Sequence, residues 1–453
     1  MRASHGWREL RDEDKQAIID SIVSGTAPAG PMHLEIDLTD RCNVDCYFCN
    51  QMDVRTKDQI PYEHIVHILD DATSKGLRSV RLSGGGDPLF HREIDRVIDA
   101  IHERGVLIDN ITTNGLSLSP AIARKLVDGH AREVVFSLNA ADANDYARMM
   151  QVKPAIFDKV TENLRHLVSI RNAEKLPTVV VQFLLDRDNY TRIREMYDLG
   201  VSLGADVIAI STVTDIPNER IDQRILLGVS DRESLRALLR DVIAADRERG
   251  LLQICFPFDE FNTLVREIES ETGTKVDTGF TTADTFEEKN GFCFFGFYSA
   301  AIRGNGDMYP CCMLMKPDYK PLGNAVRSSF ADEWRGAGFN QLRHEMREVL
   351  LSGGAAEYQE GQYATLTAAC VNAHACGLKN MYFRHDADFY RDLGLALAKA
   401  RSKEIRFLGN RQQLARALQQ AKHRHPRLRR AYEAFARRTP RVRAWLKRHL
   451  SVR

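Results

Sequence analysis

The 453-residue sequence has no run of 18 apolar residues, and its first 16 residues, MRASHGWRELRDEDKQ, contain no apolar segment. The first absence argues against a membrane-spanning helix, and the second gives no sign of a secretory signal peptide. Nine cysteines are nevertheless present. Without a secretory signal, this many cysteines indicate metal or redox chemistry rather than a disulfide framework. We therefore expect a cytoplasmic protein with no membrane partner.

A large net charge is also lacking, since 63 Lys and Arg balance 62 Asp and Glu. The charge is nevertheless distributed unevenly along the chain. Residues 401–453 contain 17 basic and 2 acidic residues, whereas the rest contains 46 basic and 60 acidic residues. We expect two amphipathic helices in this tail, interrupted at Pro426 and Pro440. A basic helix can bind a membrane or nucleic acid, but charge runs more often cover a solvated face. We therefore expect the tail to dock on the acidic body or on a redox partner.

Short β-branched segments alternate with amphipathic segments such as YEHIVHILDDATSKG between residues 34 and 250. This alternation predicts an α/β fold with parallel strands. Eight units would close a full barrel, whereas six predict a partial, open-sided (β/α)6 barrel with its chemistry at the C-terminal ends of the strands. The six predicted strands are His33–Leu38, Arg78–Ser83, Val106–Thr113, Glu133–Leu138, Thr178–Leu185 and Asp206–Thr212.

Three cysteines, Cys42, Cys46 and Cys49, follow the first predicted strand within the segment DLTDRCNVDCYFCN. A structural zinc site needs a fourth ligand, for which His64 or His67 is a candidate. A thioredoxin-like C-x-x-C pair would leave Cys42 unused. A third interpretation is a 4Fe–4S cluster that three thiolates hold, with one iron open to another ligand. We favour this interpretation.

The C-x3-C-x2-C spacing, with the aromatic Phe48 before the last cysteine, resembles the radical S-adenosylmethionine (radical SAM) superfamily. The resemblance implies that Cys42, Cys46 and Cys49 bind a 4Fe–4S cluster. It also implies that S-adenosylmethionine binds the open iron through its amino and carboxylate groups. Phe48 is then expected beside the cofactor.

Other segments match the same family at the ends of later strands. SGGGDPL places Gly85, Gly86 and Asp87 where the family has Gly-Gly-Glu-Pro, with Asp in place of Glu, and implies contact with the methionine amino group. Glycines at a strand end allow backbone to approach a ligand closely. Further along the chain, the resemblance implies that Ser137 and Asn139 bind the ribose or methionine portion, that Arg148 pairs with the carboxylate, and, less specifically, that Gln182 lies nearby.

A second group of cysteines surrounds the segment CFFGFYSAAIRGNGDMYPCC, which predicts a β-hairpin. This order resembles the twitch or SPASM domain that holds an auxiliary 4Fe–4S cluster, and nine cysteines suit the shorter twitch form. The resemblance implies Cys293, Cys311, Cys370 and Cys376 as ligands, although Cys370-x5-Cys376 is wider than usual. Cys312 competes with Cys311, because adjacent side chains of a strand point to opposite faces.

The resemblance covers residues 32–382 and predicts four parts. They are an N-terminal helical extension (1–30), a radical SAM partial barrel (31–255), an auxiliary-cluster domain (256–385) and a basic helical tail (386–453). Cys255 is expected to be a buried small hydrophobic residue.

The chemistry implied by the resemblance is reductive cleavage of S-adenosylmethionine to a 5′-deoxyadenosyl radical, which abstracts hydrogen from a substrate. We expect a sugar or aminoglycoside in natural-product or antibiotic biosynthesis, with dehydration, dehydrogenation or epimerisation as the outcome. The first 30 residues are too short for the leader-peptide-binding module of many peptide modifiers, but a peptide maturase is the alternative. An electron donor of the flavodoxin or ferredoxin type, and a partner reductase, are expected. RNA modification and a non-catalytic electron carrier are weaker hypotheses.

Overall fold

A computed structural model describes residues 12–27, 30–49, 51, 55–213, 222–254, 259–277, 293–316, 319–352, 386 and 388–402. By its internal contacts the chain divides into two compact units, Met1–Phe389 and Tyr390–Arg453. Cys255, Cys370, Cys376 and residues 403–453 of the basic tail lie outside the described residues. The roles predicted for them therefore stay predictions.

A ten-stranded sheet with the order β10-β9-β8-β1-β2-β3-β4-β5-β6-β7 forms the centre of the first unit. Its strands β1 to β7 run parallel. All six predicted strands are confirmed, and a short seventh follows the sixth unit. The parallel strands are β1 (His33–Ile36), β2 (Ser79–Leu82), β3 (Leu107–Thr113), β4 (Glu133–Ser137), β5 (Thr178–Leu185), β6 (Val207–Thr212) and β7 (Leu252–Ile254).

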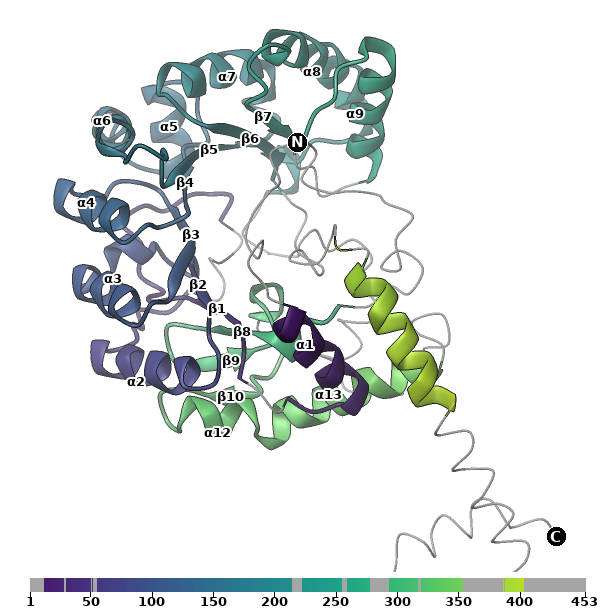
Figure 1. Ribbon diagram of the computed structural model, residues 1–453. Coiled ribbons are helices and arrows are strands. Elements are labelled where there is room, and N and C mark those ends of the chain that lie inside the picture. The colour runs from purple at the N-terminus through teal and green to yellow at the C-terminus, as the bar shows by residue number, and fades with distance from the viewer. Residues whose placement is uncertain are drawn as a thin grey trace, which may run out of the picture. The chain divides into compact units, whose positions relative to one another are not determined.

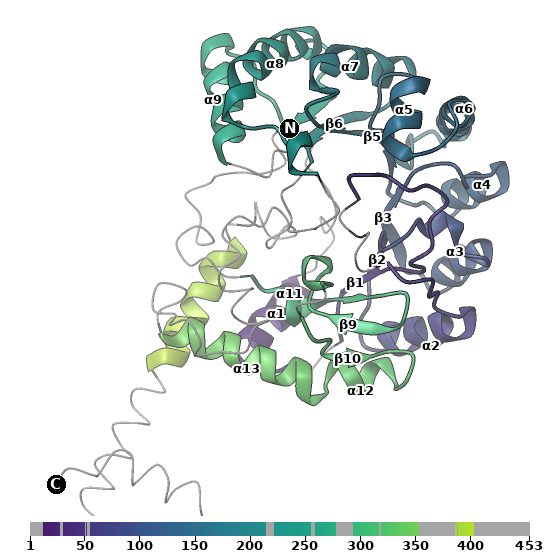
Figure 2. The same cartoon turned by 180° about the vertical axis from the view of Figure 1, so that it is seen from behind.

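Helices α2 to α9 cover the convex side of this sheet, as the two opposite views in Figures 1 and 2 show. Their apolar positions recur at helical spacing, so that Ile94, Val97, Ile98 and Ile101 of α3 are all buried. The helices are α2 (Tyr62–Thr73), α3 (Ile94–Glu103), α4 (Pro120–Asp128), α5 (Ala143–Met150), α6 (Ala155–Ile170), α7 (Ile193–Ser202), α8 (Arg232–Asp246) and α9 (Asp259–Thr272). Short 3-10 turns are η1 (Pro88–Phe90), η2 (Tyr190–Arg192), η3 (Gln223–Ile225), η4 (Val229–Asp231) and η5 (Cys312–Leu314).

The concave side of β4, β5 and β6 is more open than the convex side. Burial alternates along β6, where Ile208 and Ile210 are buried while Ala209 and Ser211 are half-buried. Since side chains of a strand alternate between its faces, the half-buried positions form the inner face of the open barrel.

The predicted hairpin is confirmed as β8 (Ser299–Ile302) and β9 (Asp307–Tyr309), with β10 (Gly323–Asn324) beside β9. Strand β8 pairs in parallel with β1, so the hairpin extends the barrel's own sheet. The sequence did not predict this attachment. Further helices are α1 (Asp12–Ser24), α11 (Phe295–Tyr298), α12 (Phe330–Trp334) and α13 (Ala337–Ser352), and residues 388–402 are also helical. None of the described helices has the length and apolar character that crossing a membrane requires.

A buried carboxylate, Asp246, connects the end of α8 to β7. Its Oδ1 accepts hydrogen bonds from the Tyr197 hydroxyl (2.8 Å) and the Leu251 amide (2.8 Å), and its Oδ2 accepts one from the Leu252 amide (3.0 Å). The backbone amides of Leu251 and Leu252 therefore both have the Asp246 carboxylate as their hydrogen-bond acceptor.

We expect Asp246→Ala to lower the free energy of unfolding by about 3 kcal/mol, because it leaves buried donors without an acceptor. Asp241→Ala on the same helix is the control, since that side chain is 59% exposed and pairs with Arg194 at 3.2 Å. It should cost less than about 0.5 kcal/mol. Denaturant midpoints of the two variants measure the difference, and equal midpoints would contradict the role given to Asp246.

Candidate active site at the ends of the parallel strands

The loop after β1 carries the three clustered cysteines and is anchored to the last turn of α5. The amides of Asp45 and Tyr47 donate to the carbonyl oxygens of Met150 (3.1 Å) and Met149 (3.4 Å). The Cys46 thiol contacts the Met150 thioether, with 3.4 Å between the sulfur atoms. The three cysteines are half-buried and form no disulfide. The loop is thus held at the C-terminal edge of the sheet, as predicted from the parallel strands.

Backbone contacts join this loop to the glycine segment after β2. The Gly86 amide donates to the Thr39 carbonyl (3.0 Å), and the Asp87 amide donates to the Arg41 carbonyl (3.1 Å). A Cβ atom on Gly86 would lie 2.0 Å from the Arg41 carbonyl oxygen. We expected these glycines to let backbone approach a ligand. The structure shows that they let the cysteine loop approach.

Asp87 is buried and connects the ends of β2 and β3. Its carboxylate accepts hydrogen bonds from the Leu89 amide (2.9 Å), the Thr113 hydroxyl (2.8 Å) and the Asn114 amide (2.7 Å). Burial raises the pKa of this carboxyl, and the hydrogen bonds oppose that rise. The side chain therefore organises the neighbouring strand end, and the Asp87 amide holds the cysteine loop through the Arg41 carbonyl.

The residues expected from β4 and β5 meet on adjacent strands. Ser137 and Gln182 are register partners and both are half-buried. Asn139 adopts a left-handed backbone conformation (φ 60°) and accepts a hydrogen bond from the Leu184 amide through its Oδ1 (3.1 Å). The oxygen of Asn139 thus stabilises the junction of β4 and β5.

Arg148, on α5, lies beside the cysteine loop. Its Nη1 donates to the Tyr47 hydroxyl (2.9 Å) and to Asp188 (3.3 Å). The Tyr47 hydroxyl also donates to the buried carboxylate of Asp186, and burial is the main cause that raises the pKa of both groups. The Nη2 of Arg148 lies 3.8 Å from the Asp145 carboxylate and makes no hydrogen bond in the described part of the chain. It is a donor to which a carboxylate could bind.

Sequence reasoning missed two donors that contact the cysteine sulfurs. Arg55 Nη2 lies 3.2 Å from the Cys49 sulfur, and Asn114 Nδ2 lies 3.7 Å from the Cys42 sulfur. In the sequence, the only sign that Asn114 contacts the cysteines is its place in TTNG at the end of a strand. No pattern indicates such a contact for Arg55. Phe48 is almost fully buried and belongs to the hydrophobic core, with its ring edge-on to Tyr47.

These residues fit a cluster better than a single metal ion. Within the described residues, no group of three or more His, Cys, Asp or Glu can hold one ion, so His64 and His67 do not complete a zinc site with the cysteines. One zinc ion needs all its sulfur ligands at about 2.3 Å, whereas each cysteine of a 4Fe–4S cluster binds a different iron. Burial raises the pKa of Cys42 and Cys46, so iron would be needed to stabilise their thiolates.

The described part of the second cysteine group packs against β1. The Cys312 amide donates to the buried carboxylate of Glu35 on the inner face of the sheet (2.9 Å). Cys293 and Cys311 are both buried. The Cys312 thiol is also hydrogen-bonded to Glu35, so Cys311 stays the predicted ligand.

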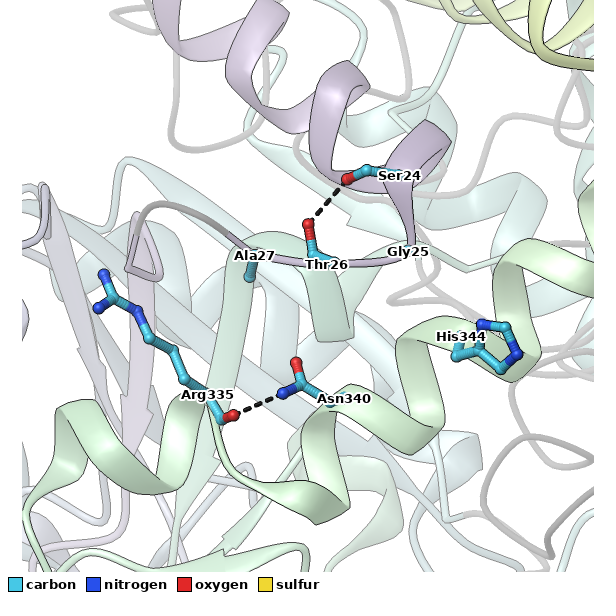
Figure 3. A pocket seen from close by; sticks show the side chains of 7 residues that line it. All are labelled: Ser24, Gly25, Thr26, Ala27, Arg335, Asn340 and His344. Carbon is cyan, nitrogen blue, oxygen red and sulfur yellow. Dashed lines mark hydrogen bonds between the residues drawn. The ribbon is translucent and has the colours of Figure 1, made fainter. Parts of the chain in front are cut away.

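A pocket of about 650 Å³ lies elsewhere, between the end of α1 and α13 (Figure 3). Its lining includes Thr26, Ala27, Arg335, Asn340 and His344. Thr26 and Ala27 precede β1, whereas the cysteine loop follows that strand. The pocket is therefore separate from the candidate active site.

We expect Gly86→Ala to lower the free energy of unfolding by about 2–3 kcal/mol, because its Cβ would displace the backbone of the cysteine loop. Iron bound at the three cysteines should fall with it. Gly228→Ala is the control, since the nearest atom to its Cβ would be 3.8 Å away. Unfolding midpoints and iron content measure both effects. Full iron content in a stable Gly86→Ala protein would contradict this role.

Comparison with known proteins agrees with this geometry. The radical SAM superfamily matches residues 36–200, and SPASM, an iron-sulfur cluster-binding domain, matches residues 293–353. The chain is 25% identical to the PqqA peptide cyclase of Streptomyces rochei over 326 residues, 70% of this chain and 78% of that protein.

Two further similarities are narrower. A GTP 3′,8-cyclase of Staphylococcus carnosus is 29% identical over 194 residues, but the match covers 38% of this chain and 56% of that protein, so the chain spans little more than half of that relative. The crystal structure of Streptococcus suis SuiB bound to its precursor peptide SuiA superposes with a TM-score of 0.55 at 18% identity, covering 80% of this chain and 74% of that one. At this identity the likeness shows the fold.

The fold, the cysteine loop and these matches lead to one conclusion. Residues 36–200 form a radical SAM domain and residues 293–353 a SPASM domain, so the protein is a radical SAM enzyme with 4Fe–4S clusters and S-adenosylmethionine as cofactors.

Proposed function

We propose that this radical SAM enzyme modifies a peptide. The observation that carries the proposal is the extent of the match to the PqqA peptide cyclase, which covers 70% of this chain and 78% of that protein. The match to the GTP 3′,8-cyclase covers only 38% of this chain. A relative that aligns over most of both lengths is the better guide to the substrate class. SuiB, whose structure contains a precursor peptide, contributes the shared fold alone.

The sugar or aminoglycoside substrate expected from the sequence has no support among these relatives, which are named for a peptide or for GTP. The peptide alternative therefore replaces it. A leader-binding protein that acts in trans would supply recognition of the peptide outside the modified segment.

The inner face of the barrel suits such a substrate. Its half-buried positions on β4, β5 and β6 include Ser137, Gln182 and Ser211, which are neutral and can hydrogen-bond. Val135 and Leu184 are the apolar neighbours on this face. On such a face, the neutral polar groups can hydrogen-bond to the amides of a peptide, and the apolar groups can contact its side chains.

In this proposal Cys42, Cys46 and Cys49 hold the catalytic 4Fe–4S cluster. When bound, the cluster and S-adenosylmethionine supply a radical that removes a hydrogen atom from the substrate. Arg148 orients the cofactor's carboxylate through its Nη2, which makes no hydrogen bond to the described residues, and the backbone of Gly85 and Gly86 meets the amino group. These contacts would hold the reacting carbon in place and exclude water.

The second cysteine group completes the proposal. Cys293 and Cys311, with Cys370 and Cys376 from outside the described residues, would hold one auxiliary cluster. A flavodoxin- or ferredoxin-type protein would deliver the electron that each cleavage of S-adenosylmethionine requires.

A protease distinguishes the two substrate classes. We would add the low-molecular-mass extract of the source cells to anaerobically reconstituted protein with S-adenosylmethionine and dithionite, and measure 5′-deoxyadenosine. The extract should increase 5′-deoxyadenosine above the level without it, and digestion of the extract with a protease that is then inactivated should remove the increase. The Cys42→Ala/Cys46→Ala/Cys49→Ala protein is the blank. An increase that survives digestion would refute a peptide substrate and point to a small molecule.

We expect Arg148→Lys to raise the Kd for S-adenosylmethionine about tenfold, since the lysine cannot form the planar two-nitrogen contact with a carboxylate. Arg192→Lys is the control, because Arg192 already pairs with Asp142 (2.7 Å) and Glu195. Isothermal titration of cluster-loaded proteins measures both affinities. An unchanged Kd in Arg148→Lys, at equal iron content, would exclude this contact.

A further inference from the structure

Tyr146 has a buried hydroxyl that the rest of the described chain does not use. The residue is 0% exposed, and its hydroxyl oxygen has no hydrogen-bond partner among the described residues. A buried polar group without a partner costs about 1–3 kcal/mol. A phenylalanine would fill the same space without that cost, so the hydroxyl calls for an explanation.

The position of Tyr146 points to the cysteine loop. Tyr146 and Met150 lie four residues apart on α5, and therefore on one face of the helix. The Met150 thioether contacts the Cys46 sulfur at 3.4 Å. The Tyr146 ring packs against Phe157, with 5.6 Å between the ring centres. Tyr146 thus stands one helical turn from a side chain that touches a cluster ligand.

The charged groups of the site also act on this hydroxyl. Burial raises the pKa of Tyr146, and negative charge on Cys46, Asp87 and Cys42 would raise it further. A phenol is protonated at neutral pH, so this group has a proton to donate. The Asp87 carboxylate already accepts hydrogen bonds from Leu89, Thr113 and Asn114, so the cysteine sulfurs are the acceptors that remain.

The other two cysteines of the loop each have one side-chain hydrogen-bond donor. Arg55 reaches Cys49, and Asn114 reaches Cys42. The side-chain contact that the structure gives the Cys46 sulfur is the Met150 thioether, which has no proton to donate. A third donor on the Cys46 side would complete one donor for each ligand.

We propose that the Tyr146 hydroxyl donates a hydrogen bond to sulfur on the Cys46 side of the bound 4Fe–4S cluster and raises the cluster's reduction potential. Hydrogen bonds to cluster sulfurs stabilise the more negative, reduced form. Tyr146 therefore acts on the electron-transfer step through its direct contact with the cluster. The inference concerns the cofactor alone and holds whether the substrate is a peptide or a small molecule.

Tyr146→Phe removes the hydroxyl and keeps the ring. In an EPR-monitored redox titration we would follow the signal that changes when S-adenosylmethionine is added, because that signal belongs to the cluster with the open iron. The midpoint should move to a more negative potential. A tenfold fall in the ratio of reduced to oxidised cluster corresponds to about 59 mV for one electron. An unchanged midpoint at full iron content would overturn the proposal.

Tyr197→Phe is the matched control, since Tyr197 is also buried but donates to Asp246, next to β7 (2.8 Å). It should leave the midpoint unchanged and lower thermal stability with or without the cluster. Tyr146→Phe should leave the cluster-free protein as stable as wild type, or more stable, and destabilise only the loaded protein. A loss of stability in cluster-free Tyr146→Phe equal to that of Tyr197→Phe would show that the hydroxyl has a partner in the chain, and would refute the proposal.

Discussion

The candidate active site depends on one contact, the close approach of the cysteine loop to the segment after β2. A Cβ atom on Gly84 would lie 2.5 Å from the Asp37 carboxyl carbon, and one on Gly86 would lie 2.0 Å from the Arg41 carbonyl oxygen. Only glycine allows this spacing. From the same segment, Asp87 accepts hydrogen bonds from the end of β3, and Asn114 in turn reaches Cys42. Three strand ends are thereby fixed relative to one another before any cofactor binds.

Buried negative charge is the cost of this arrangement. Asp37 and Asp87 are buried near the cysteines, and burial raises the pKa of both. A cluster with three thiolates adds further negative charge to a place with little water. The donors Arg55, Asn114 and, in our proposal, Tyr146 offset part of that charge. The groups that stabilise the negative charge of the thiolates therefore also influence the reduction potential of the cluster.

The SPASM domain is joined to the barrel through a shared sheet rather than through a linker alone. Strand β8 pairs with β1 along His33–Ile36, and the Cys312 amide bonds to Glu35 on that strand. Both cysteine groups are thus positioned by β1. The first group follows the end of this strand, and the second packs on its side. One strand therefore positions both groups.

Hydrophobic periodicity and motif spacing determined the six βα units, the hairpin and the three-cysteine loop, because each depends on residues close together in the chain. The edge at which those cysteines lie followed as well, since parallel strands end on one side of a sheet. Only the tertiary structure decided that β8 joins β1, that the glycines face the loop, and that Arg148 pairs with Tyr47 and Asp188. These contacts join residues 40 to 266 positions apart, and no local pattern encodes such a pairing.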